Sequence, residues 1–496
     1  MPEPDVAAAA RRGPHVLRDA QVGRRVVHGG AVRIAGFAVV NLLGAAGVVV
    51  LQRTLGVVDY GRYGTALALV AIVSLVTDAG LTITGSRELA LHPHGEDRRA
   101  LVGTILGLRC ALSAVGVGVC AAFAAVAGYG AAMVAGVAMA GGGAILIAGQ
   151  AALTLPLIVD LRNGRLTLTE LAKQVILLAG FGAVWLAGGG LVAFLAIQIA
   201  VGAGSLALTA RLLAPEDRTW PQVDLGAWRD LARKALPVAA AAVLAIVYVR
   251  MLVVLASLLT SERQTGLVVA SARVVEIAGG LPLLVAGIVL PVAAVAARED
   301  RVRLRFVTGR LTEVALLLGS LVAVALAVAA HPLVVLLGGE AFAGAAPVLR
   351  IHAAAVATFF VIQSWVVLLL ADGRRRAVVV SSLVGLVAVV AAGLVLIPLY
   401  DAKGAAIAAV IADVADGAAL AVSLRSITGR AWPTPASFMA RFAVALAAAL
   451  AVGVLLPAPA VARAAGAVAV LGAGALALRI VPSEVLDAVP RRRRAD

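Results

Sequence analysis

The sequence is poor in charged residues, which make up only 14% of its 496 residues. Hydrophobic residues account for 62%, and the mean hydropathy is +1.02. A soluble globular protein does not need so much apolar surface, so that class is excluded. The apolar residues lie in continuous blocks of about 20 rather than in alternation, which is typical of membrane-spanning helices and not of a membrane barrel. We therefore predict an all-α polytopic membrane protein.

Groups that would support redox, metal or nucleotide chemistry are also scarce. Cys110 and Cys120, the only two cysteines, lie about 15 Å apart along one predicted helix, beyond the reach of a disulfide. No G-x-x-x-x-G-K-[ST] phosphate loop is present, so direct use of ATP is not supported. His92 and His94 beside Glu96 and Asp97 could hold a metal, but a solvated turn explains them better. We expect no cofactor and no metal.

The apolar blocks predict about 14 transmembrane helices. The predicted spans are 34–51, 63–84, 101–126, 130–157, 167–187, 191–210, 235–259, 267–294, 311–330, 351–370, 377–397, 404–424, 442–456 and 464–478. They form two pseudo-symmetric six-helix lobes and a C-terminal helix pair. The predicted divisions are a basic segment at 1–33, the N-lobe at 34–210, a linker at 211–234, the C-lobe at 235–424, the helix pair with its preceding loop at 425–478, and a basic tail at 479–496.

A short internal repeat is consistent with two lobes. DYGRY at 59–63 precedes the second span of the first lobe, and QTGLV at 264–268 precedes the corresponding span of the second lobe. Aligning Gly61 with Gly266 superposes the starts of these two helices. Internal repeats of this kind are typical of secondary transporters.

The distribution of basic residues predicts the orientation. Most of the 42 lysine and arginine residues fall into alternate loops, and the positive-inside rule places these loops and both termini in the cytoplasm. We expect a multi-pass protein of the plasma or inner membrane. The formal net charge of +15 is then explained by contact with anionic membrane lipids, and nucleic acid is not expected as a partner.

Three charged residues inside predicted spans indicate a binding site. Arg250 lies about 15 Å before the turn SERQTG at 261–266, and Arg273 lies about 10 Å after it, so both reach similar depths. Each arginine costs roughly 2.5–3.5 kcal/mol at a helix centre and normally faces protein or a wet cavity. Glu276 shares a helix face with Arg273, but one carboxylate cannot neutralise two arginines. The residues predict a cavity for an anion, and the alternative is a salt bridge that only joins two helices.

Other polar residues in the spans allow two interpretations each. Arg109 could face the same cavity or extend to the cytoplasmic interface. Asp413 and Asp416 could bind a coupling proton or cation, or pair structurally with an arginine. Four amides could line the cavity, although hydrogen bonds between helices explain such side chains more often; they are Asn41, Gln150, Gln198 and Gln363.

Several motifs resemble the polysaccharide biosynthesis, or Wzx-type oligosaccharide flippase, family. The opening helices carry RTLGVVDYGRYG at 53–64, DAGL at 78–81 and SRELA at 86–90. Later segments are similar in the same order, namely GLVVASAR at 266–273, GEAFAGAAPVLRI at 339–351 and IPLYDAKGAAIA at 397–408. Val268 departs from the family, in which an aromatic residue is common at this position.

The resemblance implies a two-lobed exporter of the multidrug/oligosaccharidyl-lipid/polysaccharide superfamily. Such proteins move polyprenyl-diphosphate-linked glycans to the outer leaflet by alternating access, serving polysaccharide assembly enzymes, and are not themselves enzymes. The predicted arginine site suits such a ligand, because guanidinium groups bind phosphate oxygens in pairs. An ion-coupled multidrug exporter is an alternative, as is a membrane-embedded glycosyltransferase or polymerase, which would need a catalytic carboxylate on an outer loop; Glu340 alone is available. With only 4% aromatic residues to stack on sugar rings, we expect modest glycan discrimination.

Overall fold

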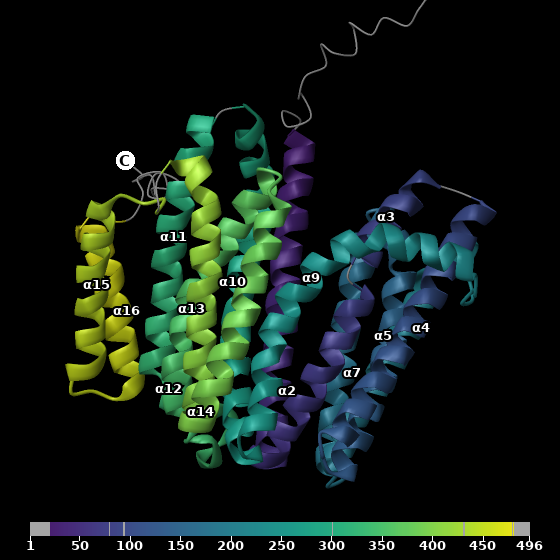
Figure 1. Ribbon diagram of the computed structural model, residues 1–496, viewed down its shortest axis with the longest axis horizontal. Coiled ribbons are helices and arrows are strands. Elements are labelled where there is room, and N and C mark those ends of the chain that lie inside the picture. Colours follow the sequence, from purple (N-terminus) through teal and green to yellow (C-terminus); the bar gives the residue numbers. More distant parts are fainter. Residues whose placement is uncertain are drawn as a thin grey trace, which may run out of the picture.

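The structure is a computed structural model. It describes residues 20–78, 80–92, 95–299, 301–429, 432–478 and 480. His94 and most of the two predicted basic terminal segments lie outside the described residues. Within the described ranges the regular elements are all helices (Figure 1). This follows from the continuous apolar blocks, because in lipid a helix satisfies its own backbone hydrogen bonds.

The N-lobe is built from the first seven helical elements. They are α2 (Ala20–Asp78), α3 (Leu81–Leu91), α4 (Glu96–Val126), α5 (Ala131–Leu153), α6 (Leu155–Val159), α7 (Asn163–Leu186) and α8 (Leu191–Leu212). Helix α2 contains two predicted spans, because Gly56 interrupts it with φ 67° and ψ −177°. A residue with a side chain rarely adopts this conformation, so glycine permits the change of direction here.

The C-lobe follows, and the C-terminal pair packs beside it. The helices of the C-lobe are α9 (Leu225–Leu259), α10 (Glu262–Glu299), α11 (Arg301–Val328), α12 (Ala330–Gly338), α13 (Ala345–Ala371) and α14 (Arg375–Thr428). Helix α14 also contains two predicted spans, separated at Asp401, where φ is 50°. The pair α15 (Ala436–Leu455) and α16 (Ala460–Ala477) lies against α11 at the edge of the molecule (Figure 1).

The described residues contain 10 helices that are long and apolar enough to cross a membrane. Two of these helices, one containing α2 and the other α14, each have a break that divides them into two spans. With each of the two counted as two spans, and with the long helices α9 and α10 added, the total equals the predicted number of about 14 spans. The predicted fold class is therefore confirmed. Helix α2 begins and α16 ends at the same end of the molecule (Figure 1).

The predicted linker at 211–234 is not a free connection. Its second half already belongs to α9, which begins at Leu225 and is capped by the Asp224 carboxylate. The Gln222 backbone N–H donates to the Gly103 carbonyl at 3.0 Å, and the Trp228 indole donates to the Thr104 carbonyl at 3.1 Å. These contacts fix the start of the C-lobe helix to α4 of the N-lobe.

The segment that the sequence offered as an outer loop is helical in the structure. Residues 330–338 form α12, and Glu340 begins a short 3-10 turn, η3 (Glu340–Phe342). Phe342 is fully buried and meets the Tyr60 ring edge to face at 5.7 Å. This segment therefore packs on α2 and gives little support to an enzyme with its catalytic carboxylate on a large loop.

The two lobes contact each other near the turn between α9 and α10. There the Arg62 guanidinium binds the Glu262 carboxylate through two hydrogen bonds of 2.9 and 2.7 Å. The Tyr129 hydroxyl lies 2.6 Å from the Ser257 hydroxyl. At the other end of the molecule, where α2 begins, the ends of α3 and α4 lie apart from α13 and α14 (Figure 1).

Candidate functional site

A cavity of about 390 Å³ lies between the two lobes. The N-lobe contributes residues of α2, α5, α7 and α8, and the C-lobe contributes residues of α9 and α10. Most of the wall is apolar. The polar or charged side chains in it are Tyr60, Tyr63, Ser74, Gln174, Gln198, Arg250, Arg273 and Glu276.

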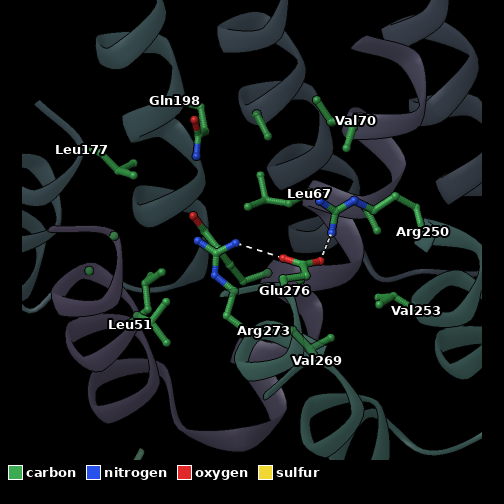
Figure 2. A pocket seen from close by; sticks show the side chains of 18 of the residues that line it. Leu51, Leu67, Val70, Leu177, Gln198, Arg250, Val253, Val269, Arg273 and Glu276 are labelled. Atoms are coloured by element: carbon green, nitrogen blue, oxygen red, sulfur yellow. Dashed lines mark hydrogen bonds and ion pairs between the residues drawn. The ribbon is translucent and has the colours of Figure 1, made fainter. Parts of the chain in front are cut away.

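The three residues that the sequence singled out meet in this cavity (Figure 2). Arg250 Nη1 donates to Glu276 Oε1 at 2.5 Å, and Arg273 Nη1 donates to Glu276 Oε2 at 3.1 Å. One carboxylate is thus shared between guanidinium groups from two helices. The Arg250 and Arg273 side chains remain 32% and 43% exposed.

The local sequence explains how these groups meet. Glu276 follows Arg273 by three residues on α10, so the two share one face of the helix. The tight turn between α9 and α10 returns the chain antiparallel, and the Thr265 hydroxyl holds it by donating to the Ala256 carbonyl at 3.2 Å. Arg250 is thereby brought to the depth of Arg273.

The cluster carries more positive than negative charge. Glu276 occupies one nitrogen of each guanidinium, and Arg250 Nε is buried with no hydrogen-bond partner among the described residues. A buried donor without a partner costs free energy. The arrangement is therefore suited to an anion with several oxygens, such as a phosphate.

Sequence reasoning missed several residues of the cavity. Tyr60, Tyr63 and Gln174 line it, together with Phe181, whose ring meets that of Tyr63 edge to face at 6.3 Å. The signal for the tyrosines was the DYGRY motif at 59–63, which entered the repeat and the family resemblance but was not interpreted as part of a binding site. Gln174 lies in a predicted span, and nothing in its neighbourhood distinguishes it.

The four predicted amides do not gather at one place. Gln198 lines the cavity close to Arg273 (Figure 2). Gln150 is buried and donates to the Thr209 hydroxyl at 3.2 Å, a bond between α5 and α8. Asn41 and Gln363 are half-buried and are not among the residues that line this cavity.

Arg109 lies in a different environment from the other two arginines. It is 1% exposed and binds Asp78 Oδ1 at 2.6 Å and the Thr82 hydroxyl at 2.6 Å. These partners lie at the break between α2 and α3. Arg109 is not among the residues that line the cavity, and it does not reach solvent as a side chain extended to the interface would.

A second cavity, of about 250 Å³, lies inside the C-lobe. Asp413 lines it, accepting hydrogen bonds from the Tyr248 hydroxyl and, at 3.3 Å, from the Thr358 hydroxyl. His352 and Glu276 also line it, so Glu276 contributes to both cavities. Asp416 is also buried but does not line this cavity. Asp416 Oδ1 has no hydrogen-bond partner among the described residues.

Three solved structures share this fold. A lipid II flippase MurJ in an inward closed conformation is similar with a TM-score of 0.72 and 12% identity, covering 90% of this chain and 98% of that chain. An inward-facing multidrug resistance MATE family transporter of the MOP superfamily has a TM-score of 0.66 and 14% identity, covering 79% and 95%. A MOP superfamily transporter from Pyrococcus furiosus, described as having a binding pocket of reverse polarity, has a TM-score of 0.56 and 16% identity, covering 79% and 93%. No curated protein matches the sequence.

The family follows from the sequence match rather than from these structures, whose low identity shows only the fold. The model of a polysaccharide biosynthesis protein family matches residues 26–296, more than half of the chain. This range includes nearly all of α2, the other N-lobe helices, the whole of α9 and nearly all of α10. The chain is therefore a multi-pass membrane protein that belongs to the polysaccharide biosynthesis protein family and has the fold of MOP superfamily transporters.

Proposed function

We propose that the protein is a flippase that moves a polyprenyl-diphosphate-linked oligosaccharide from the inner to the outer leaflet of the cell membrane. The observation that carries this proposal is the sharing of one carboxylate, Glu276, by Arg250 and Arg273 in a cavity between the lobes. A diphosphate brings several anionic oxygens and can bind both guanidinium groups at once. The ligand would displace Glu276 from the two arginines, so in the empty site this carboxylate neutralises only part of their charge.

The direction of access follows from the positive-inside rule. Both described chain ends lie at one end of the molecule, which the rule assigns to the cytoplasm. The contact of Arg62 with Glu262 then lies on the outer side. The structure corresponds on this assignment to a state closed toward the outside. Alternating access would require the lobes to separate at this contact and to approach at the cytoplasmic end.

Energy coupling is proposed at the C-lobe cavity. Asp413 is the buried carboxylate that faces this cavity, and Glu276 faces both cavities. A proton or cation bound near Asp413 would change the electrostatic potential at Glu276. It would therefore change the free energy needed to break the ion pairs of Glu276 with the two arginines. Asp416, which does not line the cavity, is assigned a structural role.

The test is complementation of a flippase-deficient strain with Arg250→Ala, Arg273→Ala and the double variant at matched membrane levels. We expect each single variant to lower surface polysaccharide and the double variant to abolish it. Arg350→Ala is the matched control, because Arg350 is an exposed arginine of the same lobe outside the cavity. Normal complementation by the double variant would refute the site.

An ion-coupled multidrug exporter is distinguished in the same strains. The C-lobe cavity contains carboxylates that could attract cationic drugs, but the surplus of guanidinium charge in the central cavity disfavours cations there. We expect no change in drug resistance on expression. Increased resistance without complementation would favour the exporter.

A further inference from the structure

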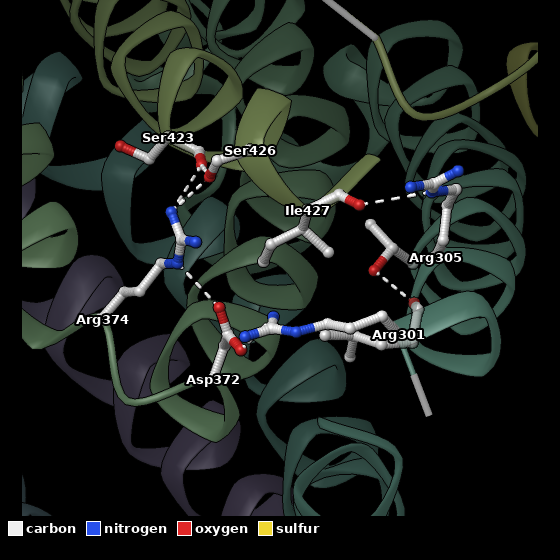
Figure 3. Close-up of polar contacts among 9 residues, drawn as sticks. Arg301, Arg305, Asp372, Arg374, Ser423, Ser426 and Ile427 are labelled. Carbon is white, nitrogen blue, oxygen red and sulfur yellow. Dashed lines mark hydrogen bonds and ion pairs between the residues drawn. The ribbon is translucent and has the colours of Figure 1, made fainter. Parts of the chain in front are cut away.

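Five arginines lie at the end of the C-lobe that the positive-inside rule assigns to the cytoplasm, and Figure 3 shows Asp372 bound by two of this group, Arg301 and Arg374. They come from the start of α11, from the turn between α13 and α14, and from the start of α14. The residues are Arg301, Arg305, Arg374, Arg375 and Arg376. They share no residue with either cavity described above.

Part of this cluster is held in place by its own contacts. The Asp372 side chain is 4% exposed and binds Arg301 Nη1 at 2.6 Å and Arg374 Nε at 2.7 Å. Arg374 Nη1 also donates to the Ser426 hydroxyl and, at 3.4 Å, to the Ser423 carbonyl. Each oxygen of the Asp372 carboxylate thus accepts a hydrogen bond from one arginine. Arg374, which lies just before α14, also binds residues near the end of α14 and so joins the two ends of this helix.

The neighbouring positive charge is not balanced. Arg375 and Arg376 are exposed, and within the described ranges no hydrogen bond or ion pair is found for the guanidinium group of either. With Arg374 they border an open hollow of about 690 Å³. Its other lining residues are Gly373, Ala377, Val422, Ser423 and Ser426.

One side of the hollow continues into an apolar surface. Ala377 and Val422 border it, and Val380, one turn further along α14, is exposed. Val422 is exposed as well. These side chains belong to the two antiparallel halves of α14, which is long and apolar enough to cross a membrane. Guanidinium groups therefore lie directly beside an exposed apolar surface of this helix.

We propose that this hollow binds the phosphate headgroup of an anionic phospholipid of the cytoplasmic leaflet. Arg375 and Arg376 would bind the phosphate oxygens, the hydroxyls of Ser423 and Ser426 would donate further hydrogen bonds to these oxygens, and the acyl chains would follow Val380 and Val422. Basic pockets between helices at this membrane face suit such headgroups. A free phosphate offers the same oxygens but gains nothing from the apolar side of the hollow.

The experiment is native mass spectrometry of the purified full-length protein titrated with phosphatidylglycerol or phosphatidylcholine. We expect the Arg375→Gln/Arg376→Gln variant to weaken the tightest phosphatidylglycerol binding roughly tenfold and to leave phosphatidylcholine binding unchanged. The control is Arg350→Gln/Lys403→Gln, which removes the same charge from exposed positions at the opposite end of the lobe. Equal losses in the two variants would overturn the site, because the effect would then be one of net charge.

Two further arms complete the test. Inorganic phosphate at millimolar concentration is added during the titration, and full displacement of the lipid would show that a free anion, not a lipid, is the occupant. Arg375→Lys/Arg376→Lys preserves the charge in case the glutamine variant fails to fold. We expect it to bind phosphatidylglycerol more weakly than the parent protein, because an ammonium group lacks the paired donors of a guanidinium. Unchanged binding by the lysine variant would contradict recognition by paired arginine donors.

Discussion

Gly61 and Gly266 meet backbone to backbone where the two lobes touch. A Cβ atom placed on Gly61 would lie 2.7 Å from the Gly266 nitrogen, and one placed on Gly266 would collide with the Val57 carbonyl. Both approaches involve main-chain atoms, which cannot move aside as a flexible side chain can. The two residues that the internal repeat aligns are therefore also in contact, as expected of equivalent positions near a pseudo-two-fold axis.

This contact predicts that Gly266→Ala shifts the protein away from the closed arrangement of the outer end. The added methyl group prevents α10 from approaching α2 and should favour separation of the lobes there. The measurement is labelling of Ser257→Cys by a membrane-impermeant maleimide, in a background lacking Cys110 and Cys120. We expect faster labelling with Gly266→Ala.

The matched control for that variant is Gly472→Ala, since Gly472 has open space where its Cβ would lie. It should label at the parental rate. If Gly266→Ala also labels at the parental rate, the glycine contact does not limit opening.

The ion pair between Arg62 and Glu262 spans the same interface but should matter less. Its side chains are 39% and 58% exposed, and exposed pairs contribute about 0.2–1 kcal/mol. Glu262→Gln should therefore alter the Ser257→Cys labelling rate less than fivefold, a smaller change than Gly266→Ala produces. A larger effect from Glu262→Gln would show that the ion pair, rather than the close backbone approach, holds the outer end closed.

Arg109 should contribute to the stability of the folded protein and not to its affinity for the ligand. Its guanidinium is 1% exposed and is neutralised by Asp78, so Asp78→Asn leaves a buried charge unpaired. Removing one partner of a fully buried pair costs about 3–5 kcal/mol, and the cost here should be smaller because the Asp78 side chain is 47% exposed. We expect a clear fall in the melting temperature of the purified protein, recovered in part by Arg109→Met in the same chain, because the double variant contains no unpaired charge.

The readout that separates this role from a binding role is affinity for the lipid diphosphate. The double variant Asp78→Asn/Arg109→Met should bind it as the parent protein does. If a well-folded double variant lost affinity for the lipid diphosphate, Arg109 would be shown to contribute to substrate binding.

The sequence was sufficient for the spans and for the central cluster, for related physical reasons. A bilayer demands long apolar helices, so hydropathy alone located the spans. The positions of Arg250 and Arg273 relative to one short turn predicted similar depths, and the structure joins both to Glu276.

Hydropathy and distances along single helices could not predict contacts between segments that are distant in the sequence. The structure pairs Arg109 with Asp78, but nothing in a hydropathy profile states which helices are neighbours. The repeat aligned Gly61 with Gly266 without showing that they touch. The gaps between predicted spans contain the breaks at Gly56 and Asp401, but hydropathy does not show at which residue the backbone changes direction.

The coupling proposal predicts different outcomes for two neighbouring aspartates. Asp413 faces the C-lobe cavity with Tyr248 and His352, whereas Asp416 does not. We expect Asp413→Asn to abolish gradient-driven transport in proteoliposomes while exchange of lipid-linked glycan without a gradient persists, because binding at Arg250 and Arg273 is intact. Asp416→Asn, the matched control on the same helix, should retain gradient-driven transport. Gradient-driven transport by Asp413→Asn at the parental rate would show that the coupling ion binds elsewhere, and loss of exchange as well would show that Asp413 supports the fold or the substrate site instead.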